Sequence, residues 1–311
     1  MAVRIWRNLL VDRIGITGVI PSVEMYKHVY GQFFTMKDEQ KLLLPGWKIM
    51  VRKNKYSTRL DCYAAYTWKK SGRRKIADIT ISVTKLSGKK TPHRYMTLTL
   101  YPSQFQADEF EHFKSVFDML FEPITYLLLY QTGKVNYLEL AADWLSRKHH
   151  SFLPYRKYCT KSEIYKEGDG YLGSTYLGSK ISDLRFRIYD KQKQLNDTGK
   201  STFTKVLPHT RIEAAMRRMG VAPADLIQMK NPFKKLLIAD LAEAKSASPD
   251  ADWQAFIVES LTHEGVPDAL SKRPQNVRKK YLAMLDKRQV SWWNPDKIWT
   301  ELPLALKRVA P

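Results

Sequence analysis

The sequence predicts an α+β fold in which antiparallel sheets are covered by helices and followed by a helical C-terminal region. Segments of alternating apolar and polar residues recur up to Gly220, which is the pattern of strands with one buried face. Residues 105–129 carry apolar side chains at helical spacing, and helical patterns separated by proline, glycine and serine follow Gly220. Helices packed on a sheet are one of the few ways to bury a sheet face. We therefore divide the chain into an N-terminal α+β lobe (1–130), a second α+β lobe that carries the candidate catalytic residues (131–220) and a basic helical region (221–311).

The N-terminal lobe is expected to hold four strands and the helices that cover them. Ser22 can cap a helix that begins near Val23, and the Lys/Arg-rich connection over 47–59 is interpreted as solvated. The helix over 105–129 should be interrupted at Pro123 and should cover one side of the sheet. The four strands are expected at residues 11–20, 61–68, 76–84 and 95–101.

The second lobe is organised around a hairpin over residues 171–191. In its returning strand Arg185, Arg187 and Tyr189 share one face, because successive strand side chains point to opposite sides of a sheet. Cations and phenols therefore line one surface. Further strands are expected at 135–144 and 209–217, with a helix at 152–165, and the C-terminal helices are expected at 222–229, 232–245, 252–264 and 274–286.

The composition favours a polyanionic partner. The chain of 311 residues has 52 lysine and arginine residues against 31 aspartate and glutamate residues, and the resulting charge of +21 suits nucleic acid or an acidic membrane surface. Neither a run of about 18 apolar residues nor a signal peptide is recognisable, so we expect a cytoplasmic protein with no membrane association. Cys62 and Cys159 lack metal-type spacing and are expected to be free thiols. The absence of a Gly-x-x-x-x-Gly-Lys-Ser/Thr loop argues against ATP-driven work.

Two carboxylates share a face of the strand at 135–144. Glu139 and Asp143 lie four residues apart with the small Ala141 between them, so both project from the same side. Oxygen ligands of this kind suit Mg²⁺ or Mn²⁺, and Glu213 of a neighbouring strand could add a third ligand. The alternative is that each is a surface carboxylate paired with lysine or arginine.

A tyrosine nucleophile is the second candidate feature. Tyr176 precedes Gly178, whose lack of a side chain lets a polynucleotide approach closely. A phenol has a pKa of about 10, so attack on phosphorus near neutral pH needs a metal-polarised phosphate, a nearby cation or a base. Arg187 and Lys191 are suitable cations. Spacing alone does not choose Tyr176 over Tyr171 or Tyr189.

A basic segment follows residue 270. Between residues 271 and 290 seven cations oppose only Asp286, a balance of 7 − 1 = +6, and tryptophans follow at 292, 293 and 299. Cations interleaved with aromatic side chains suit phosphate contact plus base stacking. A solvated helix face packed by a tryptophan pair is the alternative. The candidate DNA contacts here are Lys272, Arg273, Arg278, Lys279 and Lys280, and those of the second lobe are Lys180, Arg185 and Arg211.

The motif Thr175-Tyr-Leu-Gly-Ser179 followed by Arg187-Ile-Tyr-Asp-Lys191 resembles the Rep-trans family of rolling-circle replication initiators. That family includes the initiators of small plasmids and filamentous phages and is related to conjugative relaxases. The order of segments also fits, because an acidic strand precedes the hairpin and Arg211-Ile-Glu213 follows it. The resemblance covers roughly residues 10–220. One departure is that Glu139 stands where the family pattern has aspartate.

The resemblance implies a fold like that of the His-hydrophobe-His (HUH) nucleases, with carboxylates as metal ligands. It also implies a metal-dependent single-strand endonuclease and strand transferase that nicks origin DNA. Tyr176 would form a 5′-phosphotyrosyl link, Glu139, Asp143 and Glu213 would hold Mg²⁺ or Mn²⁺, and Arg187 and Lys191 would stabilise phosphate charge. A homodimer and a host helicase partner are expected.

Two other functions remain open from the sequence. A non-catalytic DNA-binding replication or architectural factor would need only the net charge and the basic C-terminal segment, and would bind DNA in a salt-sensitive way without cutting it. A hydrolytic nuclease that uses metal-bound water would leave no protein on the cut end.

Overall fold

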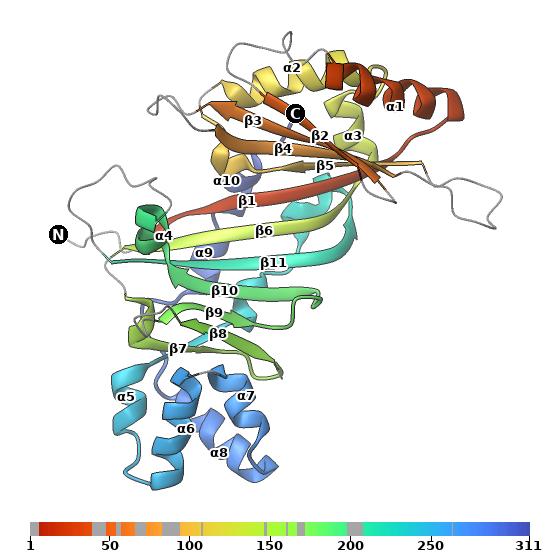
Figure 1. The fold of residues 1–311 in the computed structure, drawn as a ribbon. Helices are drawn as coiled ribbons and strands as arrows, with labels where there is room; N and C mark the ends of the chain where they lie inside the picture. The colour runs from red at the N-terminus through yellow and green to blue at the C-terminus, as the bar shows by residue number, and fades with distance from the viewer. Residues whose placement is uncertain are drawn as a thin grey trace. The chain divides into compact units, whose positions relative to one another are not determined.

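The computed structural model confirms the predicted α+β class, with strands in a large antiparallel sheet and helices packed on it (Figure 1). The chain forms two compact units. The N-terminal unit comprises Val11–Leu138, Arg218–Met229 and Leu306–Pro311, and the hairpin unit comprises Met1–Leu10, Glu139–Arg217 and Lys230–Ala305. The structure describes residues 6–38, 48–53, 57–65, 73–82, 94–106, 108–145, 148–159, 161–166, 172–197, 208–262 and 264–311.

The N-terminal unit is a sheet in the order β2-β3-β4-β5-β1-β6. The pairings of β2 with β3, β3 with β4, β4 with β5 and β5 with β1 are antiparallel. Alternate residues are buried, such as Ile14 and Ile16 of β1 opposite Leu100 and Leu98 of β5, as half-buried strands require. The strands are β1 (Trp6–Val19), β2 (Lys48–Lys53), β3 (Ser57–Ala65), β4 (Arg73–Ser82), β5 (Tyr95–Leu100) and β6 (Lys134–Leu145).

Helices α1 (Val23–Asp38), α2 (Glu109–Phe121) and α3 (Tyr126–Thr132) lie along one side of these strands (Figure 1). Helix α2 buries Phe113, Phe117 and Phe121, whose spacing of four residues places them on one helix face. The predicted interruption near Pro123 is confirmed, because α2 ends at Phe121 and α3 begins at Tyr126. The segment 47–59, expected to be a connection, instead contains β2 and the start of β3, which pair with each other.

The hairpin unit continues the strand order as β1-β6-β11-β10-β9-β8, and β12 and β7 form a separate pair. The predicted hairpin is present, with antiparallel β9 and β10 joined by the turn at residues 178–183. Gly178 adopts φ +100, and an added Cβ would lie 2.9 Å from the carbonyl oxygen of Leu184, so the turn requires glycine. The strands are β7 (Phe152–Tyr155), β8 (Ser162–Lys166), β9 (Leu172–Leu177), β10 (Leu184–Asp190), β11 (His209–Val221) and β12 (Leu237–Asp240).

The predicted helix over 152–165 is wrong. Phe152–Tyr155 forms β7, whose four side chains are all buried and which pairs with β12, and Ser162–Lys166 forms β8. A short apolar run has no periodicity that separates a buried strand from a helix, and the pairing with β12 decides it. The short helix α4 (Lys191–Asp197) follows β10 directly.

A bundle of four helices occupies the C-terminal part of the hairpin unit (Figure 1). Its core contains Trp253 and Phe256 of α6 and Tyr281 of α8, whose ring centroids lie 4.9–5.3 Å apart. The predicted helices at 252–264 and 274–286 are confirmed. The helix predicted at 222–229 is a 3₁₀ helix, and 232–245 divides into a 3₁₀ helix, β12 and α5. The helices are α5 (Leu241–Ser246), α6 (Ala251–Thr262), α7 (Gly265–Ser271), α8 (Gln275–Asp286), α9 (Pro295–Trp299) and α10 (Leu302–Leu306), with 3₁₀ helices at Pro102–Gln104, His149–Ser151, Pro223–Gln228 and Pro232–Lys235.

The two units do not follow the three sequence-based regions. The hairpin unit joins most of residues 131–220 to most of the helical region, while β1, β6 and β11 contribute residues to both units. Whether the three regions act as separate functional parts stays a prediction. None of the helices in the described part of the chain combines the length and apolar character that crossing a membrane requires.

Candidate active site

Four side chains from consecutive strands of the hairpin unit form one row across the sheet. Glu163 of β8 is paired with Tyr176 of β9, Tyr176 with Arg187 of β10, and Arg187 with Glu213 of β11. Directly opposed residues project from the same sheet face. The strand register therefore brings together Tyr176, Arg187 and Glu213, which the sequence singled out on three separate segments. We call these four residues the Tyr176 row.

Tyr176 lies among cations. The guanidinium carbon of Arg185 is 4.0 Å from the centre of the Tyr176 ring, and that of Arg187 is 5.6 Å away. Tyr165 packs against the same ring in a T-shaped arrangement, with the two ring centroids 5.3 Å apart. These three contacts hold the Tyr176 ring in place. Because the side chain is half-buried, part of it still reaches solvent. Arg185 is itself fixed by Glu163, with nitrogen and oxygen 3.0 Å apart.

Tyr189 has a different environment from Tyr176. It is 2% exposed and its hydroxyl donates a hydrogen bond of 2.7 Å to Glu213. Burial, followed by the charge of Glu213, raises the pKa of Tyr189 well above its ordinary range. Tyr189 is therefore held as a neutral hydrogen-bond donor. The third candidate tyrosine, Tyr171, lies outside the described residues.

Lys191 begins α4 beside this pair. Its ammonium group donates to the Tyr189 hydroxyl at 3.5 Å and to Gln194 at 2.7 Å. The guanidinium of Arg187 lies 4.1 Å from the Tyr189 ring and 3.7 Å from a Glu213 oxygen. Arg187 thus contacts Glu213 directly, while Lys191 contacts the tyrosine hydroxyl that donates to Glu213. A cavity of about 130 Å³ lies here, lined by Gly173, Ser174, Arg187, Tyr189, Asp190, Lys193, Gln194 and Asp197.

Glu139 and Glu213 belong to a group of carboxylates that could hold a metal ion. Glu139 is half-buried and Glu213 is buried, and both belong to the hairpin unit, where they offer carboxylate oxygens within 4.8 Å of each other. Carboxylate oxygens are the ligands that Mg²⁺ and Mn²⁺ prefer, so the donor set fits the predicted cofactor. We call these two residues the carboxylate cluster.

Asp143 has cationic partners instead of a place in this cluster. Arg211 donates two hydrogen bonds of 2.7 Å to its carboxylate, and His209 Nε2 lies 3.1 Å from it. All three side chains are buried. Burial alone would raise the pKa of Asp143, but the contacts with Arg211 and then His209 hold the pKa well below its ordinary value. This is the alternative weighed for each acid, a carboxylate paired with arginine, and the ligand role of Asp143 stays a prediction.

Arg211 also bears on the predicted DNA contacts. It is 7% exposed and engages Asp143 through two nitrogens, so it has little surface to offer DNA. Lys180, by contrast, is exposed on the turn between β9 and β10.

Helix α8 presents a basic outer face. Tyr281 and Leu285 point into the bundle core, while Arg278, Lys279 and Lys280 are exposed. The two cations before the helix are engaged by acids, Lys272 by Glu264 and Arg273 by Glu259.

The tryptophans that follow the basic segment belong to the core. Trp292 and Trp293 pack against buried Trp144 with ring centroids 5.6 and 5.1 Å away. The Trp293 indole N–H donates to the backbone oxygen of Leu236. This packing agrees with the alternative weighed for the segment, a packed tryptophan pair; Trp293 is buried and Trp292 is half-buried.

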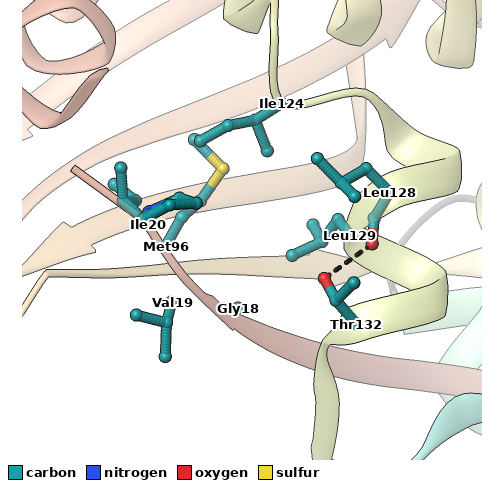
Figure 2. Close-up of a pocket in the computed structure, with 9 residues that line it drawn as sticks. Gly18, Val19, Ile20, Met96, Ile124, Leu128, Leu129 and Thr132 are labelled. Carbon is teal, nitrogen blue, oxygen red and sulfur yellow. Dashed lines mark hydrogen bonds between the residues drawn. The ribbon is translucent and has the colours of Figure 1, made fainter.

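An apolar pocket in the N-terminal unit is lined without charged or metal-binding side chains (Figure 2). It measures about 200 Å³ and is lined by Gly18, Val19, Ile20, Pro21, Met96, Ile124, Leu128, Leu129 and Thr132. The hydroxyl of Thr132 is used in a hydrogen bond to the Leu128 carbonyl, as Figure 2 shows. No titratable side chain lines the pocket, so acid–base or phosphoryl chemistry cannot be assigned to it.

Comparison with solved structures finds three similar chains. No protein-family model and no curated protein sequence matches the chain. Among solved structures, a rolling circle replication initiator protein from Geobacillus stearothermophilus aligns with a TM-score of 0.36 and 11% identity, over 71% of this chain and 77% of that chain. At that level of similarity, the function has to be argued from the side chains of this chain.

Proposed function

We propose that the protein is a rolling-circle replication initiator that nicks and rejoins one strand of origin DNA through a phosphotyrosyl intermediate. The observation that carries the proposal is the Tyr176 row, in which a partly exposed phenol, a guanidinium and a buried carboxylate lie in register on adjacent strands. Tyr176 and Glu213 are two strand spacings apart, about 10 Å, and Arg187 lies between them. A phosphate over Arg187 could therefore meet the Tyr176 hydroxyl on one side and a cation held by Glu213 on the other.

The residues of this chain divide the work as follows. The Tyr176 hydroxyl gives up its proton to solvent and attacks phosphorus, so that a new phosphorus–oxygen bond forms while the bond to the 3′ oxygen breaks. The 3′ oxygen leaves with the bonding electrons and takes up a proton. Arg185 and Arg187 place positive charge beside the attacking ring, and Lys191 adds a cation at the Tyr189 hydroxyl, which donates to Glu213. Attack by a 3′-hydroxyl on the phosphorus of the phosphotyrosyl link reverses these steps. The bond to Tyr176 then breaks and the DNA strand is rejoined.

The carboxylate cluster would hold the divalent cation. Glu139 and Glu213 would bind Mg²⁺ or Mn²⁺ and leave positions for water and phosphate oxygens. When bound, such an ion supplies Lewis-acid polarisation of the phosphate. The predicted homodimer, the host helicase partner and the cytoplasmic location stay predictions.

Replacing Glu139 by glutamine should weaken Mn²⁺ binding by at least about tenfold, because the amide removes one anionic ligand. Titration of the full chain with Mn²⁺, followed by electron paramagnetic resonance, measures this without relying on activity. Glu163→Gln is the matched control, since Glu163 lies at the other end of the Tyr176 row and pairs with Arg185. Equal Mn²⁺ affinity in Glu139→Gln and wild type would remove Glu139 from the metal site.

A non-catalytic DNA-binding factor is the second candidate, and the exposed cations of α8 favour it. Incubation with supercoiled origin DNA and Mn²⁺ separates the two functions. A nicking enzyme relaxes the DNA in a reaction that EDTA stops, whereas a binding factor leaves it supercoiled. A water-using nuclease would also relax the DNA but would leave its cut ends free of protein.

The basic face of α8 should supply affinity for DNA and not chemistry. Lys279→Gln/Lys280→Gln should weaken DNA binding about tenfold near 0.15 M salt and lower the salt dependence of binding. The nicking rate at saturating DNA should stay unchanged. Lys307→Gln/Arg308→Gln removes the same charge from exposed positions elsewhere and is the control. Fluorescence anisotropy across a salt series makes the measurement, and equal losses in both variants would show a general charge effect.

A further inference from the structure

A second cavity lies at the turn that follows Tyr176. It measures about 430 Å³ and belongs wholly to the hairpin unit. None of the catalytic or metal-binding roles proposed above uses it. We call it the turn cavity, and its lining residues are Arg156, Tyr158, Cys159, Lys161, Gly178, Ser179, Ser182, Asp183, Leu184 and Lys235.

The charges of the turn cavity favour an anion. Arg156, Lys161 and Lys235 oppose Asp183, a balance of 3 − 1 = +2. Arg156 is held in place because its guanidinium donates 3.0 Å to the backbone oxygen of Leu184. Lys161 and Lys235 are exposed, and neither has an ion-pair partner among the residues that the structure describes. Two flexible ammonium groups and one fixed guanidinium can therefore converge on a bound phosphate.

The turn also offers a hydroxyl donor. Ser179 and Ser182 place their hydroxyl oxygens 2.9 Å apart, and the Ser182 oxygen accepts the backbone N–H of Ser179 at 3.0 Å. One hydroxyl proton is used between the two serines, so the other is available to a phosphate oxygen. The backbone N–H of Gly178 donates to the backbone carbonyl of Lys161, and this hydrogen bond joins the turn to the segment that carries Lys161.

An aromatic ring lines the same cavity. Tyr158 is 97% exposed, although a tyrosine ring ordinarily buries much of its apolar area. Nucleobases stack on exposed aromatic side chains in single-strand binding sites. A cavity with cations and a hydroxyl for phosphate, and a free ring for a base, matches the chemistry of one nucleotide.

We propose that the turn cavity binds one nucleotide of the DNA strand next to the nick, with its phosphate on Lys161, Lys235 and the serine pair and its base on Tyr158. The inference rests on the proposed function. Gly178 is two residues beyond Tyr176, about 7 Å along an extended chain, which is about two steps of stacked bases. The site would hold the strand in register so that the correct phosphate meets Tyr176.

A phosphate scan tests the site without any cleavage. Single-stranded origin oligonucleotides carry one neutral methylphosphonate at successive positions, and their affinity for the full chain is measured by anisotropy in EDTA. The affinity of the wild-type chain should fall about tenfold when the methylphosphonate stands at one position within two nucleotides of the nick. Lys161→Gln/Lys235→Gln should bind the unmodified strand about tenfold more weakly and show no further loss at that position. Lys234→Gln, an exposed neighbour of Lys235, is the control and should behave as wild type.

The base contact has its own test. Tyr158→Ala should weaken binding about tenfold on a normal strand and not at all on a strand that is abasic at the sensitive position. An equal loss of affinity on methylphosphonate substitution in wild type and in Lys161→Gln/Lys235→Gln would overturn the proposal. So would a free deoxynucleoside triphosphate that binds in a Tyr158-dependent way while oligonucleotide affinity is insensitive to both variants.

The outcome is separable from that of the proposed function. Formation of a covalent adduct by wild type with Mn²⁺ reports on the phosphotyrosyl mechanism. The scan in EDTA reports only on how the strand is held, so either result can fail while the other stands.

Discussion

Tyr176→Phe should abolish the covalent link to DNA while binding stays within about twofold of wild type. The substitution removes only the attacking oxygen, and loss of a nucleophile lowers turnover by at least about a thousandfold. The ring should stay in place, because Arg185 and Tyr165 contact its face and edge and not its hydroxyl. The measurement is a denaturing gel of the chain incubated with Mn²⁺ and a suicide oligonucleotide.

Tyr189→Phe is the matched control. It removes a hydroxyl from the same sheet face, but one that donates to Glu213 and is buried. The adduct should still form with Tyr189→Phe, at a reduced rate. An adduct that persists in Tyr176→Phe would contradict the assignment and direct attention to Tyr189 and Tyr171.

Asp143→Asn should lower the free energy of unfolding by about 3 kcal/mol, because it leaves Arg211 as a buried charge without its anionic partner. Urea denaturation followed by tryptophan fluorescence measures the loss. Glu139→Gln, on the same strand and half-buried, should change the free energy of unfolding by less than about 0.5 kcal/mol. The pair of variants separates a structural carboxylate from a ligand.

The acid stability of the same two proteins follows from the lowered pKa of Asp143. An unfolded aspartate titrates near about pH 3.9, so the stabilisation is complete above that pH and is lost as the pH falls toward the folded-state pKa. The stability difference between wild type and Asp143→Asn should therefore shrink below about pH 4. If Asp143→Asn instead unfolds like wild type and has lost Mn²⁺ affinity, Asp143 is a metal ligand.

The site was predictable where it depends on local patterns. The alternation in β10 and β11 places Arg187, Tyr189 and Glu213 on one face, and antiparallel pairing then sets Tyr176 opposite Arg187. The break between α2 and α3 was predictable for the same reason, since a proline in a helix interior removes a backbone hydrogen bond and clashes with the preceding turn.

The rest depends on contacts between distant segments. Arg211 pairs with Asp143, yet no local pattern in the sequence reveals which carboxylate an arginine from another strand will meet. The basic segment after residue 270 shows the same limit. Five of its seven cations are exposed, whereas Trp292 and Trp293 pack on Trp144, which lies about 150 residues away in the chain.

Identification of the DNA-linked residue tests the central claim most directly. Wild type is trapped on a suicide oligonucleotide with Mn²⁺, digested with trypsin and nuclease, and sequenced by mass spectrometry. Tryptic residues 167–180 contain both Tyr171 and Tyr176, so fragmentation must place the nucleotide within that peptide. We expect the phosphodiester on Tyr176. A nucleotide on any other residue, or DNA that is cut without a linked peptide, would contradict the account.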